Sequence, residues 1–73
     1  MAIVWKFEAR VQQDDGRSSS KTCFVAIADL RAALEALEKD QKVTGTNPGE
    51  LLSEEEVAVT LGYPLEEGAI VCL

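Results

Sequence analysis

The sequence contains no histidine and only two cysteines, and only 5% of its residues are aromatic. Without histidine, a Ser-His-Asp triad, a Cys-His dyad and zinc sites that need imidazole ligands are excluded. The cysteines form no CxxC motif, and neither an Asp-x-Asp-x-Asp-Gly calcium loop nor a Gly-Lys-Ser/Thr phosphate loop is present. We therefore expect no catalytic residue, no cofactor and no metal ion.

Cys23 and Cys72 could form one disulfide at most, whereas small secreted domains usually carry several and follow a signal peptide. From Met1 the chain reaches charged residues at once, and no apolar run approaches the length of a signal peptide or a membrane span. We expect a cytoplasmic protein with reduced thiols that serve as small core residues. Cys72 is the better candidate for a reactive thiol because chain ends fray most easily.

Basic residues are scarce in the second half of the chain. Residues 1–37 hold five basic and five acidic residues, whereas residues 38–73 hold two basic and eight acidic ones, so the whole net charge of −6 arises there. Such a surface repels nucleic-acid phosphates and anionic membranes and attracts basic protein surfaces. We expect a protein partner with a basic surface, no direct nucleic-acid binding and no membrane binding.

The candidate partner-binding residues are therefore acidic, together with the single tryptophan, which is the residue best suited to an interface if it is exposed. They are Glu50, Glu54, Glu55, Glu56, Glu66, Glu67 and Trp5. A simpler interpretation treats the run at 54–56 as solvated carboxylates that favour a helix dipole, and Trp5 as part of the core.

Apolar residues alternate with polar ones from Ile3 to Val11, which predicts a half-buried strand. Asp15-Gly16 follows and is typical of a hairpin turn. A two-residue turn would place Phe7 opposite Phe24, whereas a bulge would shift the register by one and turn Cys23, Val25 and Ile27 toward the core. In either register the second strand, residues 22–28, is apolar on both faces and therefore central.

Asp29 is a predicted N-cap for a helix whose leucines and alanines follow helical spacing. Breaker residues then predict a loop over residues 43–50. Ser53 and Glu56 have the spacing of a capping box, and Gly62 fits the left-handed position after a short second helix, although the β-branched run 57–61 could also form a strand. Residues 69–73 are expected to form a buried strand.

The expected fold is a single small α+β domain, residues 1–73, in the order β-β-α-α-β. Its sheet would have three strands, antiparallel or mixed, with one or two helices on one face. The pattern does not decide whether the last strand pairs with the first or the second. A chain of this length has little volume for a concave active site, so we expect no enzymatic activity.

These observations favour a small acidic inhibitor or adaptor that docks on a basic surface of a larger protein, for example a nucleic-acid-binding one. By analogy alone, phage-encoded antagonists of host machinery are frequently of this size and character. The alternative is an accessory subunit or a self-assembling homo-oligomer in which apolar strands continue a sheet across a dimer. A third hypothesis, a small thiol or metal-dependent activity, has the least support.

Overall fold

The computed structural model describes residues 3–73, which form an antiparallel sheet and two helices. The elements in chain order are β1 (Val4–Gln12), β2 (Ser18–Val25), α1 (Leu30–Asp40), β3 (Val43–Thr46), β4 (Glu50–Leu52), α2 (Glu54–Leu61) and β5 (Ile70–Cys72). The strand order is β3-β1-β2-β5, and β4 pairs with β1 beyond the end of β3. The α+β class is confirmed, but the prediction of three strands is wrong because the sheet has five.

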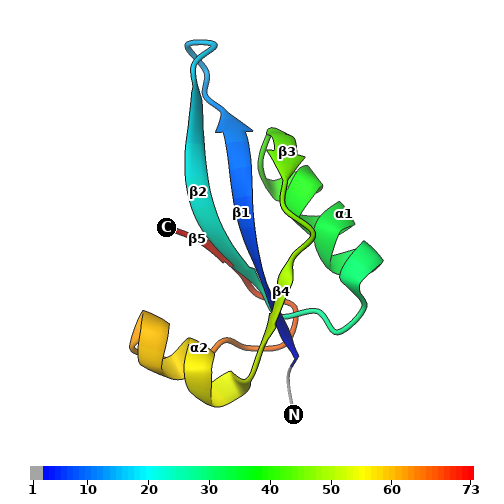
Figure 1. Cartoon of the computed structure of the whole chain (residues 1–73), viewed down its shortest axis with the longest axis vertical. Helices are drawn as coiled ribbons and strands as arrows, with labels where there is room; N and C mark the ends of the chain where they lie inside the picture. Colours follow the sequence, from blue (N-terminus) through cyan, green and yellow to red (C-terminus); the bar gives the residue numbers. More distant parts are fainter. Residues whose placement is uncertain (1–2) are drawn as a thin grey trace.

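The hairpin between β1 and β2 projects beyond both helices (Figure 1). Its tip is a loop of three residues, 14–16. The Gly16 N–H donates to the Gln13 carbonyl (3.0 Å), and the Gln13 N–H donates to the Arg17 carbonyl (2.6 Å). Gly16 has φ +85°, which matches a type I turn followed by a left-handed residue. The odd loop length selects the shifted register, in which Phe7 lies opposite Cys23, and this decides between the two registers that the sequence leaves open.

α1 covers one face of the sheet, as Figure 1 shows on the right of the view. Its buried residues pack against the inward stripe of β1 and against alternate residues of β2. This α1 core consists of Phe7, Ala9, Val11, Cys23, Val25, Ala33 and Leu37. The apolar residues in the alternating segment 3–11 thus lie under α1, except that Ile3 is 41% exposed.

α2 covers the opposite face, at one end of the sheet. The α2 core consists of Val4, Phe24, Ala26 and Val57, with Leu52, Leu61 and Leu65 packed against it. The prediction that the helices share one face is therefore wrong. The physical reason lies in β2, where Phe24 points away from Cys23 and Val25 and needs a cover of its own.

The caps of both helices are confirmed. The Asp29 side chain accepts from the Arg31 N–H (2.9 Å), and the Ser53 hydroxyl accepts from the Glu56 N–H (3.2 Å). Gly62 ends α2 with φ +83°. Residues 57–61 are helical rather than extended, because the cap chemistry outweighs the weak strand preference of valine and threonine.

The segment predicted as a loop, residues 43–50, contains β3 and the start of β4, both paired to β1. Between them, Asn47 accepts the Glu8 N–H through Oδ1 (3.1 Å) and donates its own N–H to the Glu8 carbonyl (3.3 Å). Gly49 then turns the chain with φ +92°. Asn47 therefore continues the ladder across the gap between two short edge strands.

β5 pairs with β2, which resolves the choice that the sequence leaves open. Val71 lies opposite Phe24, and Cys72 lies opposite Cys23. β2 therefore lies between β1 and β5, so its predicted central place in the sheet is confirmed.

Candidate functional site

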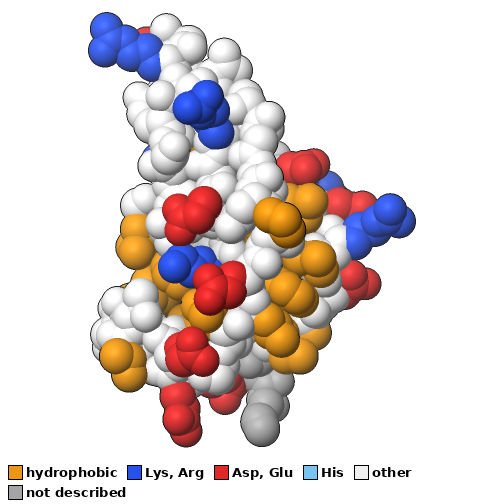
Figure 2. Space-filling view, in the orientation of Figure 1, with side chains coloured by type: hydrophobic (Ala, Val, Ile, Leu, Met, Phe, Trp, Pro, Cys, Tyr) orange, Lys and Arg blue, Asp and Glu red, His pale blue; other side chains and the backbone are white. Residues whose placement is uncertain are grey.

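The six candidate glutamates lie close together along the chain, on β4, on the first turn of α2 and in the loop before β5. All six are exposed, and no lysine or arginine follows Lys42 in the sequence. We call this surface the acidic end, defined by Glu50, Glu54, Glu55, Glu56, Glu66 and Glu67. Figure 2 shows acidic side chains over the lower half of the molecule and beside α1, and basic side chains near the hairpin tip, beside α1 and among the acidic ones of the lower half.

Part of the acidic end serves the fold. The Ser53 hydroxyl accepts from the Glu56 N–H and donates to the Glu56 carboxylate at Oε1 (3.2 Å), which closes the first turn of α2. Three carboxylates in that turn also favour the N-terminal end of the helix dipole. Glu56 is therefore in part a capping residue, as the simpler interpretation of the run at 54–56 holds.

Glu50, Glu55, Glu66 and Glu67 are different. None of them makes an ion pair or a side-chain hydrogen bond with any other residue in the described range 3–73. Glu50 lies directly opposite Lys6 in the β1–β4 pairing, so a basic residue offsets part of its charge, whereas the charges of Glu55, Glu66 and Glu67 act on the surrounding solvent over about 8–10 Å at physiological ionic strength. These four carboxylates are thus the part of the acidic end that is available for an outside partner.

Trp5 lies apart from the acidic end. It packs against the α1 core, and its indole N–H donates to the Ala28 carbonyl (3.0 Å), which ties β1 to the segment before α1. α2, which carries three of the glutamates, packs on the opposite face of the sheet. Among the glutamates, Glu54, Glu55 and Glu56 share the first turn of α2, Glu50 lies on β4, and Glu66 and Glu67 precede β5, whereas Trp5 packs on the α1 side of the sheet.

Trp5 instead belongs to a group of exposed or half-buried apolar side chains near the free edge at β4. It lies opposite Leu51, which is 56% exposed, and the neighbouring residues Ile3 and Leu30 are 41% and 39% exposed. Figure 2 shows hydrophobic side chains gathered between β4 and α1. We call Ile3, Trp5, Leu30 and Leu51 the apolar patch. Sequence reasoning missed Leu51 because residue 51 follows a predicted loop and shows no strand period.

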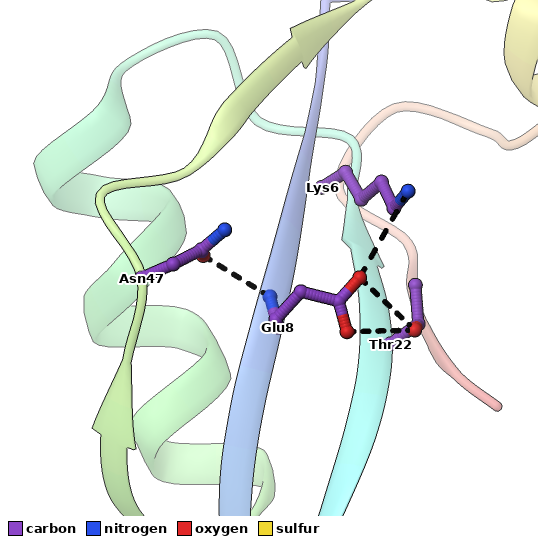
Figure 3. Close-up of polar contacts among 4 residues, drawn as sticks. All are labelled: Lys6, Glu8, Thr22 and Asn47. Atoms are coloured by element: carbon purple, nitrogen blue, oxygen red, sulfur yellow. Dashed lines mark hydrogen bonds and ion pairs between the residues drawn. The ribbon is translucent and has the colours of Figure 1, made fainter.

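The open half of the sheet face that α2 leaves uncovered carries a small polar cluster (Figure 3). The Thr22 hydroxyl donates to both oxygens of the Glu8 carboxylate (3.0 and 3.2 Å), and Lys6 Nζ lies 3.8 Å from Glu8 Oε1. Glu8 is exposed, so the ion pair is worth at most about 1 kcal/mol. The cluster is a solvated sheet face that supports the pairing of β1 with β2.

The two cysteines are bonded to each other. Cys23 Sγ and Cys72 Sγ form a disulfide between β2 and β5, with a Cα–Cα distance of 4.0 Å. The expectation of two reduced thiols is therefore wrong, because β5 pairs with β2 in a register that sets the two residues side by side. Cys23 is fully buried in the α1 core, as expected for a small core residue, whereas Cys72 is half-buried at the sheet edge.

Two ion pairs in residues 3–73, Lys6–Glu8 and Asp15–Arg17, lie at the surface. No polar or charged residue is buried there, and no three His, Cys, Asp or Glu side chains lie close enough together to hold a metal ion. The open hollow beside the hairpin tip is lined mainly by polar and charged side chains of the hairpin. The exposed features of this part of the chain include its surface charge and the apolar patch.

Neither helix in the described part of the chain is long and apolar enough to cross a membrane. Comparisons with protein-family models, with curated proteins and with solved structures find no match to the chain.

Proposed function

We propose that this chain is a small acidic, non-enzymatic interaction protein that docks through its acidic end on a basic surface of a larger protein. The observation that carries the proposal is that the exposed carboxylates of Glu50, Glu55, Glu66 and Glu67 make no ion pair or side-chain hydrogen bond with residues 3–73, although Glu50 lies opposite Lys6. They surround α2, in a stretch of chain that contains no basic residue.

The chemistry of the partner follows from this charge. Exposed carboxylates that form no ion pair within a small protein attract lysine- and arginine-rich surfaces and accelerate the encounter with them. Proteins that bind nucleic acid present such surfaces, so an inhibitor or adaptor that covers one fits the size and charge of this chain. A phage-type antagonist of host machinery, acting in the cytoplasm, is one form of this proposal and rests on analogy alone.

The absence of buried polar groups in residues 3–73 supports a non-enzymatic role. Acid–base catalysis depends on titratable groups whose pKa is adjusted by burial or by close neighbours. The glutamates of the acidic end are exposed instead, which suits long-range attraction of a charged partner.

Affinity capture with matched charge variants tests the proposal. The variant Glu55→Lys/Glu67→Lys reverses two charges of the acidic end, and the control Glu35→Lys/Glu38→Lys makes the same change in net charge on exposed positions of α1. We expect a partner that binds the native chain and the control but is lost with the first variant. A partner retained equally by both variants, or lost equally by both, would contradict docking through the acidic end.

The second candidate function is self-assembly as a homo-oligomer, which the apolar patch favours. Leu51 lies on a three-residue edge strand beside Trp5, and exposed edges with apolar side chains are pairing sites. Sedimentation at low and high salt separates the two functions. A dimer that dissociates with Leu51→Glu would support self-assembly, whereas a monomer at all concentrations would exclude it.

A further inference from the structure

The C-terminal strand is held to the fold by few contacts. β5 has three residues, all half-buried, and pairs only with β2. Around it, the Leu73 N–H donates to the Thr22 carbonyl (2.8 Å), the Gly68 N–H donates to the Ala26 carbonyl (2.8 Å), and the Ala26 N–H donates to the Ala69 carbonyl (2.9 Å). A short edge strand with these bonds alone belongs to the parts of a protein that open most easily.

The disulfide adds a covalent tie at this weak point. It joins Cys72 on the edge strand to Cys23, which is fully buried in the α1 core. While the bond is closed, β5 cannot leave β2 without disturbing the core. The disulfide therefore acts most directly on the local stability of β5, compared with the other elements of the fold.

None of the fully buried side chains in the described chain belongs to β5. Every buried hydrophobic residue in the described chain lies between Val4 and Val57 and belongs to β1, β2, the segment after β2, α1 or α2. Residues 62–73 contribute half-buried side chains such as Leu65 and Ile70 at the margins of the two cores. Release of β5 would thus remove no fully buried side chain, although it would uncover the margin of the α1 core beside Ile70 and Cys72.

We propose that the Cys23–Cys72 disulfide is a redox-operated latch, closed when oxidised and open when reduced, that controls whether residues 68–73 stay on the sheet. In a cytoplasmic protein a disulfide is usually transient and regulatory, which gives such a latch a physiological input. The inference does not depend on the proposed docking function, because it concerns the state of β5 alone.

The opening step needs a dithiol reductant. One of its thiolates attacks the Cys72 sulfur, the S–S bond breaks, and Cys23 leaves as a thiolate that takes up a proton. The second thiolate of the reductant then attacks the mixed disulfide, closes the reductant's own disulfide and releases Cys72, which is protonated in turn. Two electrons pass from the reductant to the protein, and both cysteines end as thiols.

An open latch uncovers a strand edge. Without β5, the backbone of β2 from Cys23 to Val25 loses its outer neighbour, and Ile70 no longer covers the margin of the α1 core. Unpaired edges with apolar side chains are sites where strands of other chains add. The reduced form would therefore present a surface that the oxidised form hides.

Hydrogen exchange of the native chain, oxidised and then treated with dithiothreitol, tests the latch. We expect reduction to accelerate amide exchange in residues 68–73 by roughly tenfold or more relative to exchange in β1 of the same molecules, because β5 then opens locally. An equal acceleration in both segments would overturn the latch, since it would mean that the bond stabilises only the whole fold. No acceleration at residues 68–73 would overturn it as well.

The variant Cys72→Ser serves as the control because it cannot form the bond. It is expected to show the fast exchange at residues 68–73 with or without dithiothreitol, and exchange in β1 of the same molecules is expected to stay at least roughly tenfold slower. Should this variant exchange at residues 68–73 as slowly as the oxidised native chain, the disulfide would not be what holds β5, and the inference would fail.

Discussion

Gly49 lies directly against the ring of Phe7. A Cβ built on Gly49 would come within 2.8 Å of Phe7 Cε1 and 3.3 Å of Leu30 Cδ1, and the residue has φ +92°. Phe7 is fully buried in the α1 core and has no room to retreat. The short connection between β3 and β4 thus fits over the core only because residue 49 has no side chain.

The substitution Gly49→Ala is therefore expected to lower the free energy of unfolding by about 2–4 kcal/mol, from a strained backbone angle together with overpacking. Gly45→Ala is the matched control, because a Cβ there meets nothing within 4 Å and the residue has no positive φ. Urea denaturation of both variants measures the difference. Equal, small losses would mean that the connection moves away from Phe7 at little cost.

Leu37→Ala is expected to cost about 2–5 kcal/mol because the side chain is fully buried between α1 and the sheet. Leu51→Ala, at 56% exposure on the edge strand, should cost less than about 1 kcal/mol. Thermal or urea unfolding of the two variants checks this contrast. A similar loss at both positions would contradict the assignment of the core to the α1 face.

Removal of the Ser53 hydroxyl in Ser53→Ala is expected to cost about 0.5–2 kcal/mol, the usual worth of an N-cap. The loss arises because the Glu56 N–H then no longer has the Ser53 hydroxyl as its hydrogen-bond acceptor. Ser18→Ala, on the exposed start of β2, is the control and should leave stability nearly unchanged. An unchanged midpoint for Ser53→Ala in a urea melt would show that the cap does not hold α2.

The local chemistry of the helices could be predicted from the sequence, whereas the layering could not. Caps such as Asp29 and Ser53 act within a few residues of chain, so their spacing alone predicts the helix starts. Which face α2 covers depends on Phe24, whose direction follows from the hairpin register. That register depends on one extra residue in the turn at Gly16, a difference that the pattern leaves open.

The pairing of the strands also explains where the structure places the candidate site residues. Glu54, Glu55 and Glu56 are adjacent in the chain and share the first turn of α2, so their grouping needed no long-range information. Trp5 and the disulfide did need it, because alternation along β1 separates Trp5 from α2, and Cys72 reaches Cys23 only when β5 pairs with β2. Strand pairing between distant segments is the information that a single sequence does not show.

Complete reduction of the disulfide is expected to lower the global free energy of unfolding as well. The bond joins residues 49 positions apart, and closing a loop of that length stabilises a fold by about 4 kcal/mol in the chain-entropy model. Urea melts with and without dithiothreitol measure the difference, and Cys72→Ser should melt like the reduced chain. Identical melts for oxidised and reduced protein would contradict a stabilising bond.

The central claim is that the acidic end steers this chain onto a basic partner, and association kinetics test it most directly. The measurement is the association rate constant of the captured partner with the native chain, with Glu55→Lys/Glu67→Lys and with the control Glu35→Lys/Glu38→Lys, from low to physiological salt. We predict a rate that falls with salt for the native chain and is roughly tenfold lower at low salt for the first variant alone, with little change in dissociation. A salt-independent rate that both variants share with the native chain would contradict the claim.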